Sequence, residues 1–238
     1  MRVLVTNATQ YAGPGVVDVL CRQGHEVLCH DASFGDAAAR AAFAAGGAVA
    51  LAGASPEEMR DELAAHGGEP DAIVSNDVFA ITPGAVEELA VDGLRASLEA
   101  LLVFPFRLTQ AFLPRMKARR NGAIVFVTSA RELRPEPGYA VQTTVRAGTT
   151  AFARALAKEV APFEVQVNVV APNFLASETY YPRAKFVDDP AGRAAIAQKV
   201  PFGRLGAPEE IGELVAFLVS GRSKFTTGQT LYFTGGWP

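Results

Sequence analysis

The 238-residue sequence predicts an α/β fold with a doubly wound, mostly parallel sheet. Short runs that are apolar throughout, such as residues 123–127, are typical of strands covered on both faces and therefore of parallel sheets. These runs alternate with longer segments in which apolar residues recur at helical spacing, such as residues 14–22. Because no internal repeat or Pro-, Gly- or Ser-rich linker interrupts the pattern, we expect a single domain over residues 1–238.

Each element is predicted from the same two patterns, taken in order along the chain. Strands are predicted where apolar residues are continuous, at residues 3–5, 26–29, 48–51, 72–74, 123–127, 165–170 and 231–233. Helices are predicted where apolar residues recur on one side or alanine is abundant, at residues 14–22, 37–45, 56–66, 91–119, 138–160 and 208–219. Gly24 ends the first helix, and Gly67 and Gly68 end the third. We expect the long helix at residues 91–119 to bend at Pro105.

The composition excludes several classes of protein. Hydrophobic residues make up 49% of the chain and charged residues 20%, which excludes a disordered chain. The net charge of −3 argues against a nucleic-acid partner. Because there is no run of 18 apolar residues and no recognisable signal peptide, we expect a cytoplasmic protein with no membrane partner. The spacing of the two cysteines and three histidines does not indicate a disulfide framework or a metal site.

Polar residues and glycines follow the predicted strands in a characteristic order. They are Thr6 after the first strand, Asn76 after the fourth, Thr128-Ser129 after the fifth, Arg146-Ala147-Gly148 in the next helix, Ala171-Pro172-Asn173 at the end of the sixth strand, and Thr227-Gly228-Gln229 with Gly235-Gly236 near the C-terminus. Over the whole chain this order resembles the short-chain dehydrogenase/reductase superfamily. The resemblance implies a Rossmann-like fold, with helices flanking the sheet.

The loop that binds the cofactor in that superfamily departs from its pattern here. The superfamily motif is T-G-x-x-x-G-x-G, whereas residues 6–13 read TNATQYAG. Asn7 and Tyr11 replace the first two glycines, and only Gly13 remains. Those glycines let the backbone approach the pyrophosphate of a dinucleotide. The ring of Tyr11 would project into the space that a cofactor needs; alternatively, it folds outward and a cofactor still binds.

Three further positions differ from the dehydrogenases. Asp77 stands where the superfamily has a small residue in its N-N-A-G stretch, and brings an anion close to the expected nucleotide. Asn173 and Phe174 follow Pro172 where dehydrogenases have glycine, and would partly fill the space of the nicotinamide. Arg146 stands where the superfamily has its lysine, and it keeps the positive charge without the compact ammonium geometry.

Together these departures resemble the halohydrin dehalogenases, a cofactor-independent branch of the superfamily. The resembling stretches are Cys29-His30-Asp31-Ala32-Ser33-Phe34, Ser75-Asn76-Asp77, Pro172-Asn173-Phe174 and Gly235-Gly236-Trp237. The resemblance implies conversion of small vicinal halohydrins to epoxides with release of halide, no cofactor, and epoxide opening by halide or other small anions. It also implies a homotetramer formed by pairing the long helices at residues 91–119 and 138–160.

The same resemblance indicates the residues that line the pocket. Those expected to bind halide or substrate are Tyr11, Pro172, Asn173, Phe174, Leu175, Tyr181 and Phe186. The stretch Tyr180-Tyr181-Pro182 and Phe186 follow the sixth strand, in a segment that covers the site in this fold. These residues either wall the substrate pocket or only pack the loop. Arg131 and Arg134, in the loop after Ser129, are expected to be solvated; alternatively, their position near the site allows a contact with an anionic group.

The catalytic set of that family is matched in two of its three members. Ser129 matches the serine that orients the substrate oxygen, and Arg146 matches the arginine that lowers the pKa of a tyrosine base. The tyrosine should stand four residues before Arg146, where this chain has Gln142. Glutamine has no group that can act as a base near neutral pH.

Tyr139 is the nearest tyrosine in the sequence, seven residues before Arg146. Residues four and seven apart share one face of a helix, so Tyr139, Gln142 and Arg146 can point the same way. Tyr139 would nevertheless start roughly 4.5 Å farther along the helix axis than the family tyrosine. Three interpretations stay open: Tyr139 is the base, water or another group serves, or the site is inactive or performs other chemistry.

Two alternative functions are retained. The first is an NAD(P)-dependent short-chain oxidoreductase with an eroded cofactor loop. Asp31 supports it, because an acidic residue after the second strand holds the adenosine ribose in NAD-dependent enzymes. The second is a non-catalytic relative that binds a small ligand, and Gln142 in the position of the family tyrosine supports it.

Overall fold

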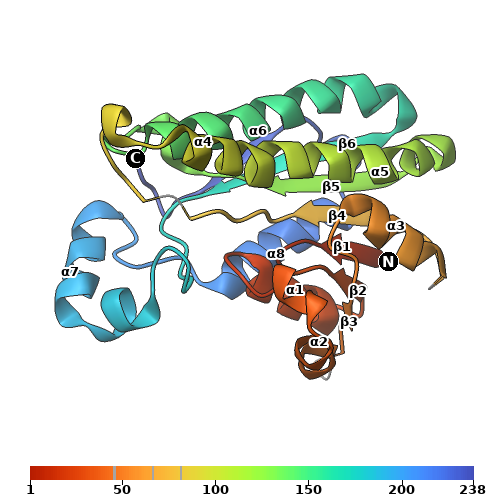
Figure 1. The fold of residues 1–238 in the computed structure, drawn as a ribbon, viewed down its shortest axis with the longest axis horizontal. Helices are drawn as coiled ribbons and strands as arrows, with labels where there is room; N and C mark the ends of the chain where they lie inside the picture. Colours follow the sequence, from red (N-terminus) through yellow and green to blue (C-terminus); the bar gives the residue numbers. More distant parts are fainter. Residues whose placement is uncertain (45–46, 66, 81) are drawn as a thin grey trace.

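One parallel sheet of seven strands organises the molecule (Figure 1). The computed structural model describes residues 1–44, 47–65, 67–80 and 82–238. The strands are β1 (Arg2–Val5), β2 (Glu26–Cys29), β3 (Val49–Ala50), β4 (Ala72–Ser75), β5 (Gly122–Val127), β6 (Val165–Pro172) and β7 (Thr230–Phe233). Their order is β3-β2-β1-β4-β5-β6-β7, and every neighbouring pair is parallel. The predicted doubly wound α/β fold is therefore confirmed.

The order of the strands determines where a site can form. The chain runs outward from β1 to β3, returns to the middle, and continues outward from β4 to β7. The loops that leave β1 and β4 consequently diverge to opposite faces of the sheet. A crevice at the carboxyl ends of the strands beside such a reversal is where open α/β sheets bind their ligands.

Helices cover both faces of the sheet (Figure 1). They are α1 (Gly13–Arg22), α2 (Ala37–Ala44), α3 (Pro56–Ala65), α4 (Val91–Leu98), α5 (Phe104–Arg119), α6 (Ala140–Val160), α7 (Pro190–Lys199) and α8 (Pro208–Val219). Side chains of α1 and α8 pack with Val3 and Val5 in one apolar cluster. Leu4 points to the opposite face and packs with side chains of α3, α5 and α6 in a second cluster. This alternation within β1 is what a strand buried on both sides requires.

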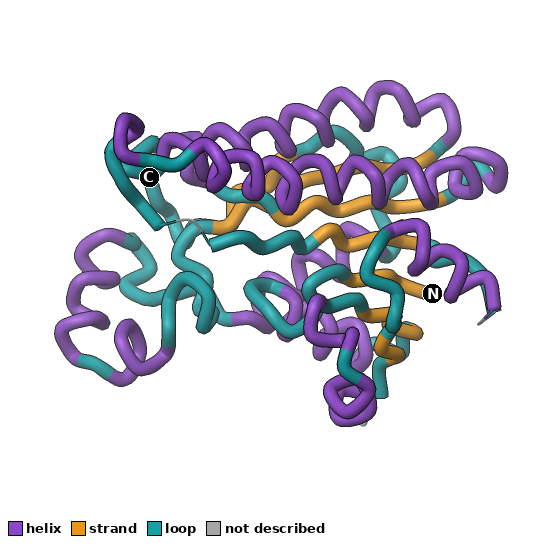
Figure 2. Tube along the Cα trace, viewed as in Figure 1, coloured by secondary structure: helices purple, strands orange, loops and turns teal. Residues whose placement is uncertain are grey.

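Helix α7 lies apart from these two layers, beside the carboxyl ends of the strands. Loops connect it to the sheet (Figure 2). The sequence analysis did not predict α7, because its alanines and charged residues show no apolar stripe. The side chain of Asp189 caps α7 by accepting hydrogen bonds from the backbone N–H groups of Ala191 and Gly192, and Pro190 occupies the first turn. Asp followed by Pro is a helix-start signal that could have identified this element.

The long helical segment is irregular just before the predicted bend. A π-helical turn at Glu99–Val103 separates α4 from α5, and Pro105 lies in the first turn of α5. Proline has no N–H to donate, so the irregular hydrogen bonding precedes it. By length and composition alone the segment Val91–Arg119 could span a membrane. Its apolar residues include Leu108 and Phe112, which are buried against the sheet, so its packing accounts for its composition.

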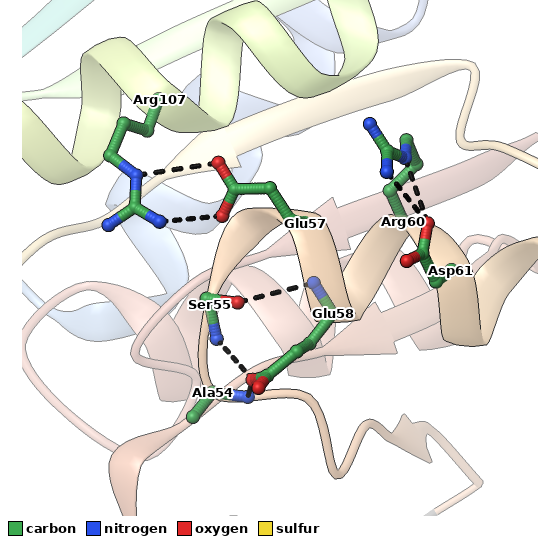
Figure 3. A network of polar contacts seen from close by, with 7 residues as sticks. All are labelled: Ala54, Ser55, Glu57, Glu58, Arg60, Asp61 and Arg107. Carbon is green, nitrogen blue, oxygen red and sulfur yellow. Dashed lines mark hydrogen bonds and ion pairs between the residues drawn. The ribbon is translucent and has the colours of Figure 1, made fainter.

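Helix α3 begins at a network of polar contacts that also ties it to α5 (Figure 3). The backbone N–H of Glu58 donates to Ser55 Oγ at 3.2 Å, and the Glu58 carboxylate accepts the N–H of Ser55 at 3.0 Å. This reciprocal pair satisfies backbone donors that the first turn of a helix leaves free. The carboxylate of Glu57 accepts two hydrogen bonds from the Arg107 guanidinium on α5.

Most predicted boundaries lie within two residues of those observed. The important difference is in α6, which begins at Ala140 instead of residue 138, so that Tyr139 is the residue that precedes it. Its backbone angles, φ −110° and ψ 19°, are not helical, which changes where its side chain points. The predicted helix ends at Ala45 and His66 lie outside the described residues.

Helices α1 and α8 cross at glycines, and this contact yields a first prediction. A Cβ atom on Gly15 would lie 2.0 Å from the carbonyl oxygen of Pro208, and one on Gly212 would lie 2.4 Å from the carbonyl oxygen of Gly15. We expect Gly15→Ala to lower the free energy of unfolding by about 1–3 kcal/mol, because the two backbones must separate. Urea denaturation measures this change.

The matched control is Gly93→Ala in α4, where a Cβ atom would meet nothing within 4 Å. Alanine loses less backbone entropy than glycine in a helix, so this variant should be more stable by about 0.5–1 kcal/mol. Equal stability of the Gly15→Ala variant and the wild type would contradict the close contact between α1 and α8.

Candidate active site

A cavity of about 350 Å³ opens at the carboxyl ends of the strands. Its walls come from the loop after β1, the end of β5, the first turns of α6, the end of β6, the segment after β6, and α7. All the site residues predicted from the sequence line it: Tyr11, Ser129, Tyr139, Gln142, Arg146, Pro172, Asn173, Phe174, Leu175, Tyr181 and Phe186. The structure therefore brings these side chains together, while their roles stay predictions.

The loop at residues 6–13 turns tightly and directs Tyr11 into the cavity. Asn7 and Tyr11 adopt left-handed backbone conformations, with φ of 46° and 53°. Gly13 allows the loop to close, because a Cβ atom there would lie 2.5 Å from the carbonyl oxygen of Asn7. The Tyr11 ring is 8% exposed, and its hydroxyl lies 3.5 Å from the carbonyl oxygen of Thr128. The alternative in which Tyr11 folds outward is therefore wrong.

Asp31 is fully engaged by hydrogen bonds within the protein. One carboxylate oxygen accepts from the backbone N–H and hydroxyl of Thr9, at 3.1 and 2.6 Å, and the other accepts from the same groups of Ser33, at 3.0 and 2.7 Å. Burial acts to raise the pKa of Asp31, but these hydrogen bonds outweigh it and hold the pKa below its ordinary value. No carboxylate lone pair is left unused for a ribose.

These two features do not fit a nicotinamide dinucleotide. The superfamily arrangement needs open backbone at the position of Tyr11, and the Tyr11 ring fills that space. It also needs a free acidic residue after β2, and Asp31 is held by Thr9 and Ser33.

Arg146 carries a positive charge beneath the cavity. Arg146 is buried, with 3% of its surface exposed. One terminal nitrogen donates to the carbonyl oxygen of Val127 at 3.1 Å, and the other donates to the hydroxyl of Tyr180 at 3.4 Å. Within the described residues, Nε has no hydrogen-bond partner and no carboxylate forms an ion pair with the guanidinium. A buried charge without a counter-ion favours an anion beside it.

Asp77 is a buried carboxylate that interacts electrostatically with Arg146. It accepts hydrogen bonds from the hydroxyls of Thr6, at 3.0 Å, and Ser75. Burial raises the pKa of Asp77 to about 6, although these hydroxyls and the charge of Arg146 act to lower it. Burial therefore makes Asp77 hold its proton on the order of 100-fold more tightly than an exposed aspartate. The ionised carboxylate, which forms no ion pair with Arg146, offsets that charge only in part.

Ser129 stands at the end of β5 and faces the cavity. Its Oγ accepts the backbone N–H of Arg131 at 3.3 Å, which caps a short 3₁₀ turn. The hydroxyl proton stays available, because this bond uses Oγ only as an acceptor. Ser129 can thus donate a hydrogen bond to the oxygen atom of a bound substrate.

Tyr139 lies in the cavity wall beneath Arg131. The guanidinium carbon of Arg131 is 3.9 Å from the centroid of the Tyr139 ring, and Arg131 also forms an ion pair with Glu136. The expectation that Arg131 is solvated is wrong, since its side chain is only 17% exposed and packs on this ring. Tyr139, Gln142 and Arg146 all line the cavity, and the ring of Tyr139 packs against Arg131.

Aromatic rings form the outer wall. The ring centroids of Phe174 and Tyr181 are 5.4 Å apart, those of Tyr181 and Phe186 are 5.2 Å apart, and Trp237 packs on Phe174 at 5.7 Å. The Tyr181 hydroxyl donates to Asn173 Oδ1 at 3.2 Å, and burial raises the pKa of Tyr181 to about 12. This wall is apolar and suits a small organic substrate or a weakly hydrated anion.

The sequence analysis did not single out the contact between Arg146 and Tyr180. The only available signal was the stretch Tyr180-Tyr181-Pro182 after the sixth strand, which was expected to wall the pocket or pack the loop. Tyr180 does line the cavity, and its hydroxyl lies within reach of two partners, Arg146 and the carbonyl oxygen of Phe79.

The chain is similar to several known proteins. A family described as enoyl-(acyl carrier protein) reductase matches residues 13–238. A halohydrin dehalogenase bound to ethyl (2S)-oxiran-2-ylacetate has a TM-score of 0.97 and 34% identity, over 100% of this chain and 97% of its own. A structure titled dehalogenation enzyme has a TM-score of 0.94 and 35% identity, over 100% and 98%. The 3-oxoacyl-(acyl-carrier-protein) reductase of Escherichia coli strain K12 is 33% identical, over 98% and 95%.

The raised pKa of Asp77 gives a prediction for stability. Because the folded protein binds this proton more tightly than the unfolded chain, the carboxylate costs stability as pH rises from about 4 to about 6, and the cost remains above that range. We expect Asp77→Asn to be more stable than the wild type at pH 8 by on the order of 1–3 kcal/mol, with a smaller difference at pH 4. Urea denaturation at the two pH values measures both.

Asp31→Asn is the contrasting variant, since the pKa of Asp31 is shifted in the opposite direction. The ionised carboxylate stabilises the fold above the pKa of the unfolded chain, so this variant should be less stable than the wild type at pH 8. Destabilisation by both substitutions at pH 8 would mean that Asp77 is a net stabilising charge.

Proposed function

The chain belongs to the short-chain dehydrogenase/reductase superfamily, and from this premise we propose that it is a halohydrin dehalogenase-like lyase. It would convert vicinal halohydrins to epoxides with release of halide, without a nicotinamide cofactor. The observation that carries the proposal is the Tyr11 ring, which occupies the cavity beside Arg146 where a dinucleotide would need space. Similarity to a halohydrin dehalogenase over the whole chain supports it.

The reaction needs a base, an oxygen-orienting donor and a place for the leaving halide. The base takes the hydroxyl proton of the substrate. The oxygen then uses the released electron pair to bond the neighbouring carbon, and the carbon–halogen bond breaks with its pair on the halide. Ser129 would hold the oxygen, and Arg146 would stabilise the negative charge that develops.

The halide would be received on the side of the cavity built by Tyr11 and residues 172–175. Aromatic edges and a few N–H groups suit a large anion that gives up water easily, and the partly offset charge of Arg146 attracts it. In the reverse direction the same space would deliver a small anion to an epoxide. No step in this scheme transfers a hydride, so no nicotinamide is required.

A second candidate function rests on Gln142. This side chain lines the cavity at the position of the family tyrosine and cannot take a proton. The candidate is a protein that binds a small neutral or anionic ligand without turning it over. The reductase alternative, suggested by relatives such as the Escherichia coli enzyme, conflicts with the positions of Tyr11 and Asp31.

Halide release tests the proposal. The purified protein, supplied with a short vicinal bromo-alcohol and no nicotinamide, should release bromide, and NADH should change neither the rate nor the melting temperature. Dependence of turnover on NADH, or a melting temperature that rises with NADH, would favour the reductase. Ligand binding without any bromide release would favour the non-catalytic protein.

Substitution of Arg146 checks that the release comes from this cavity. We expect Arg146→Gln to lower kcat by about 100-fold or more, because it removes the charge that stabilises the developing anion. Arg146→Lys should recover only part of the loss, since an ammonium cannot keep both hydrogen bonds of the guanidinium. The matched control is Arg22→Gln, an exposed arginine paired with Asp18, which should leave kcat unchanged.

A further inference from the structure

The proposed reaction needs a base that the sequence does not supply at Gln142. A positive charge such as that of Arg146 can stabilise the ionised form of a tyrosine base. Four of the five tyrosines line the cavity. Tyr11, Tyr139, Tyr180 and Tyr181 therefore compete for the role. Their contacts distinguish them, because the base must have its hydroxyl oxygen beside the charge that stabilises its ionised form.

We propose that Tyr180 is the catalytic base, an inference that rests on the proposed dehalogenase function. Its hydroxyl oxygen lies 3.4 Å from a terminal nitrogen of Arg146. Among the described residues it is the tyrosine whose hydroxyl makes this contact. The tyrosine–arginine pair of the family is thus assembled from the segment after β6 and helix α6, instead of from two positions on α6.

The other three tyrosines have different partners. Tyr11 directs its hydroxyl to the carbonyl oxygen of Thr128, and burial raises its pKa. Tyr181 donates to Asn173, and burial raises its pKa as well. Tyr139 presents its ring to Arg131, whose charge is already paired with Glu136. Each of these tyrosines therefore lacks the hydroxyl contact with an unpaired cation that Tyr180 has.

The surroundings of Tyr180 hold its ring and leave its hydroxyl loosely bound. The Tyr11 ring meets it edge to face, with centroids 5.0 Å apart and planes at 80°. Ser177 anchors the backbone, since its Oγ accepts the N–H of Tyr180 at 3.4 Å and its carbonyl oxygen accepts the N–H of Tyr181 at 2.8 Å. The hydroxyl itself has two long contacts, to Arg146 and to the carbonyl oxygen of Phe79, both 3.4 Å.

Long contacts of this kind are expected before a substrate arrives, and they leave the oxygen able to turn toward it. In the step, ionised Tyr180 takes the substrate hydroxyl proton, so its O–H bond forms as that of the substrate breaks. The substrate oxygen closes the epoxide, and the halide leaves with the electron pair of the carbon–halogen bond. Tyr180 then returns its proton to solvent, which balances the charge of the departing halide.

This arrangement also gives Tyr11 a second role, as a positioning residue. Its ring supports the edge of Tyr180 while its face lies toward Arg146, with the guanidinium carbon 5.9 Å from the ring centroid. The residue that fills the former cofactor space thereby contacts both partners of the proposed catalytic pair.

Bromide release by Tyr180→Phe and Tyr139→Phe tests the assignment, since each change removes one hydroxyl and keeps the ring. We expect Tyr180→Phe to lower kcat by about 100-fold or more, with KM little changed, and Tyr139→Phe to stay within a few-fold of the wild type. Loss in Tyr139→Phe with retention in Tyr180→Phe overturns the assignment.

A rescue variant separates loss of the base from loss of folding. Gln142→Tyr combined with Tyr180→Phe places a tyrosine at the family position, and we expect it to recover at least ten-fold of the lost kcat. A double variant that stays inactive, although its melting temperature and circular dichroism match the wild type, overturns the assignment.

The same variants distinguish failure of this inference from failure of the proposed function. If the wild type releases no bromide but Gln142→Tyr alone does, the cavity is that of a dehalogenase and Tyr180 is not its base. If neither releases bromide from any of several bromo-alcohols, the dehalogenase function itself fails, and the assignment of Tyr180 fails with it.

Discussion

A positive charge buried at the edge of the sheet is the constraint on which the site depends. Arg146 gives up most of its hydration, and the only hydrogen-bond acceptors it has among the described residues are the carbonyl oxygen of Val127 and the hydroxyl of Tyr180. Removing a guanidinium from water costs several kcal/mol unless hydrogen bonds or an opposite charge offset the loss. The nearby carboxylate, Asp77, offsets it in part, because it interacts with Arg146 electrostatically without forming an ion pair. The protein therefore gains most when an anion enters the cavity, and the chemistry we propose creates one.

Reductases are among the relatives of this chain, and a few side chains distinguish its cavity from a site that could hold a dinucleotide. The crevice at the carboxyl ends of the strands comes from strand order. What enters the crevice depends on the loop after β1, where Tyr11 faces inward, and on Asp31, which is held by Thr9 and Ser33. Fold and function are thus set at different levels, the first by the apolar strands and the second by side chains at their ends.

Much of the fold could be predicted from the sequence. Parallel strands are recognisable as apolar runs, and their carboxyl ends meet at one edge of the sheet. The resemblance to the halohydrin dehalogenases assigned residues as distant as Tyr11, Ser129 and Asn173 to one site, and the structure brings them together in the cavity. The predictions failed where tertiary contacts decide. Arg131 was expected in solvent but packs on Tyr139, whose non-helical backbone at the start of α6 no periodicity could show. The partner of Arg146 comes from a loop 34 positions away, and no spacing rule relates a helix to the fold of such a loop.

The chemistry of arginine explains how a catalytic pair could survive loss of its usual tyrosine. A lysine at position 146 would present one compact ammonium group, best placed for a single partner, whereas a guanidinium presents five donors in a planar fork. In this protein one arm of the fork contacts the β5 backbone, another contacts Tyr180, and Nε has no hydrogen-bond partner among the described residues. A tyrosine that approaches from the segment after β6 therefore meets the same charge as one on α6 would. In the site we propose, arginine in place of lysine removes the constraint that the base must share its helix, and Gln142 is then compatible with catalysis.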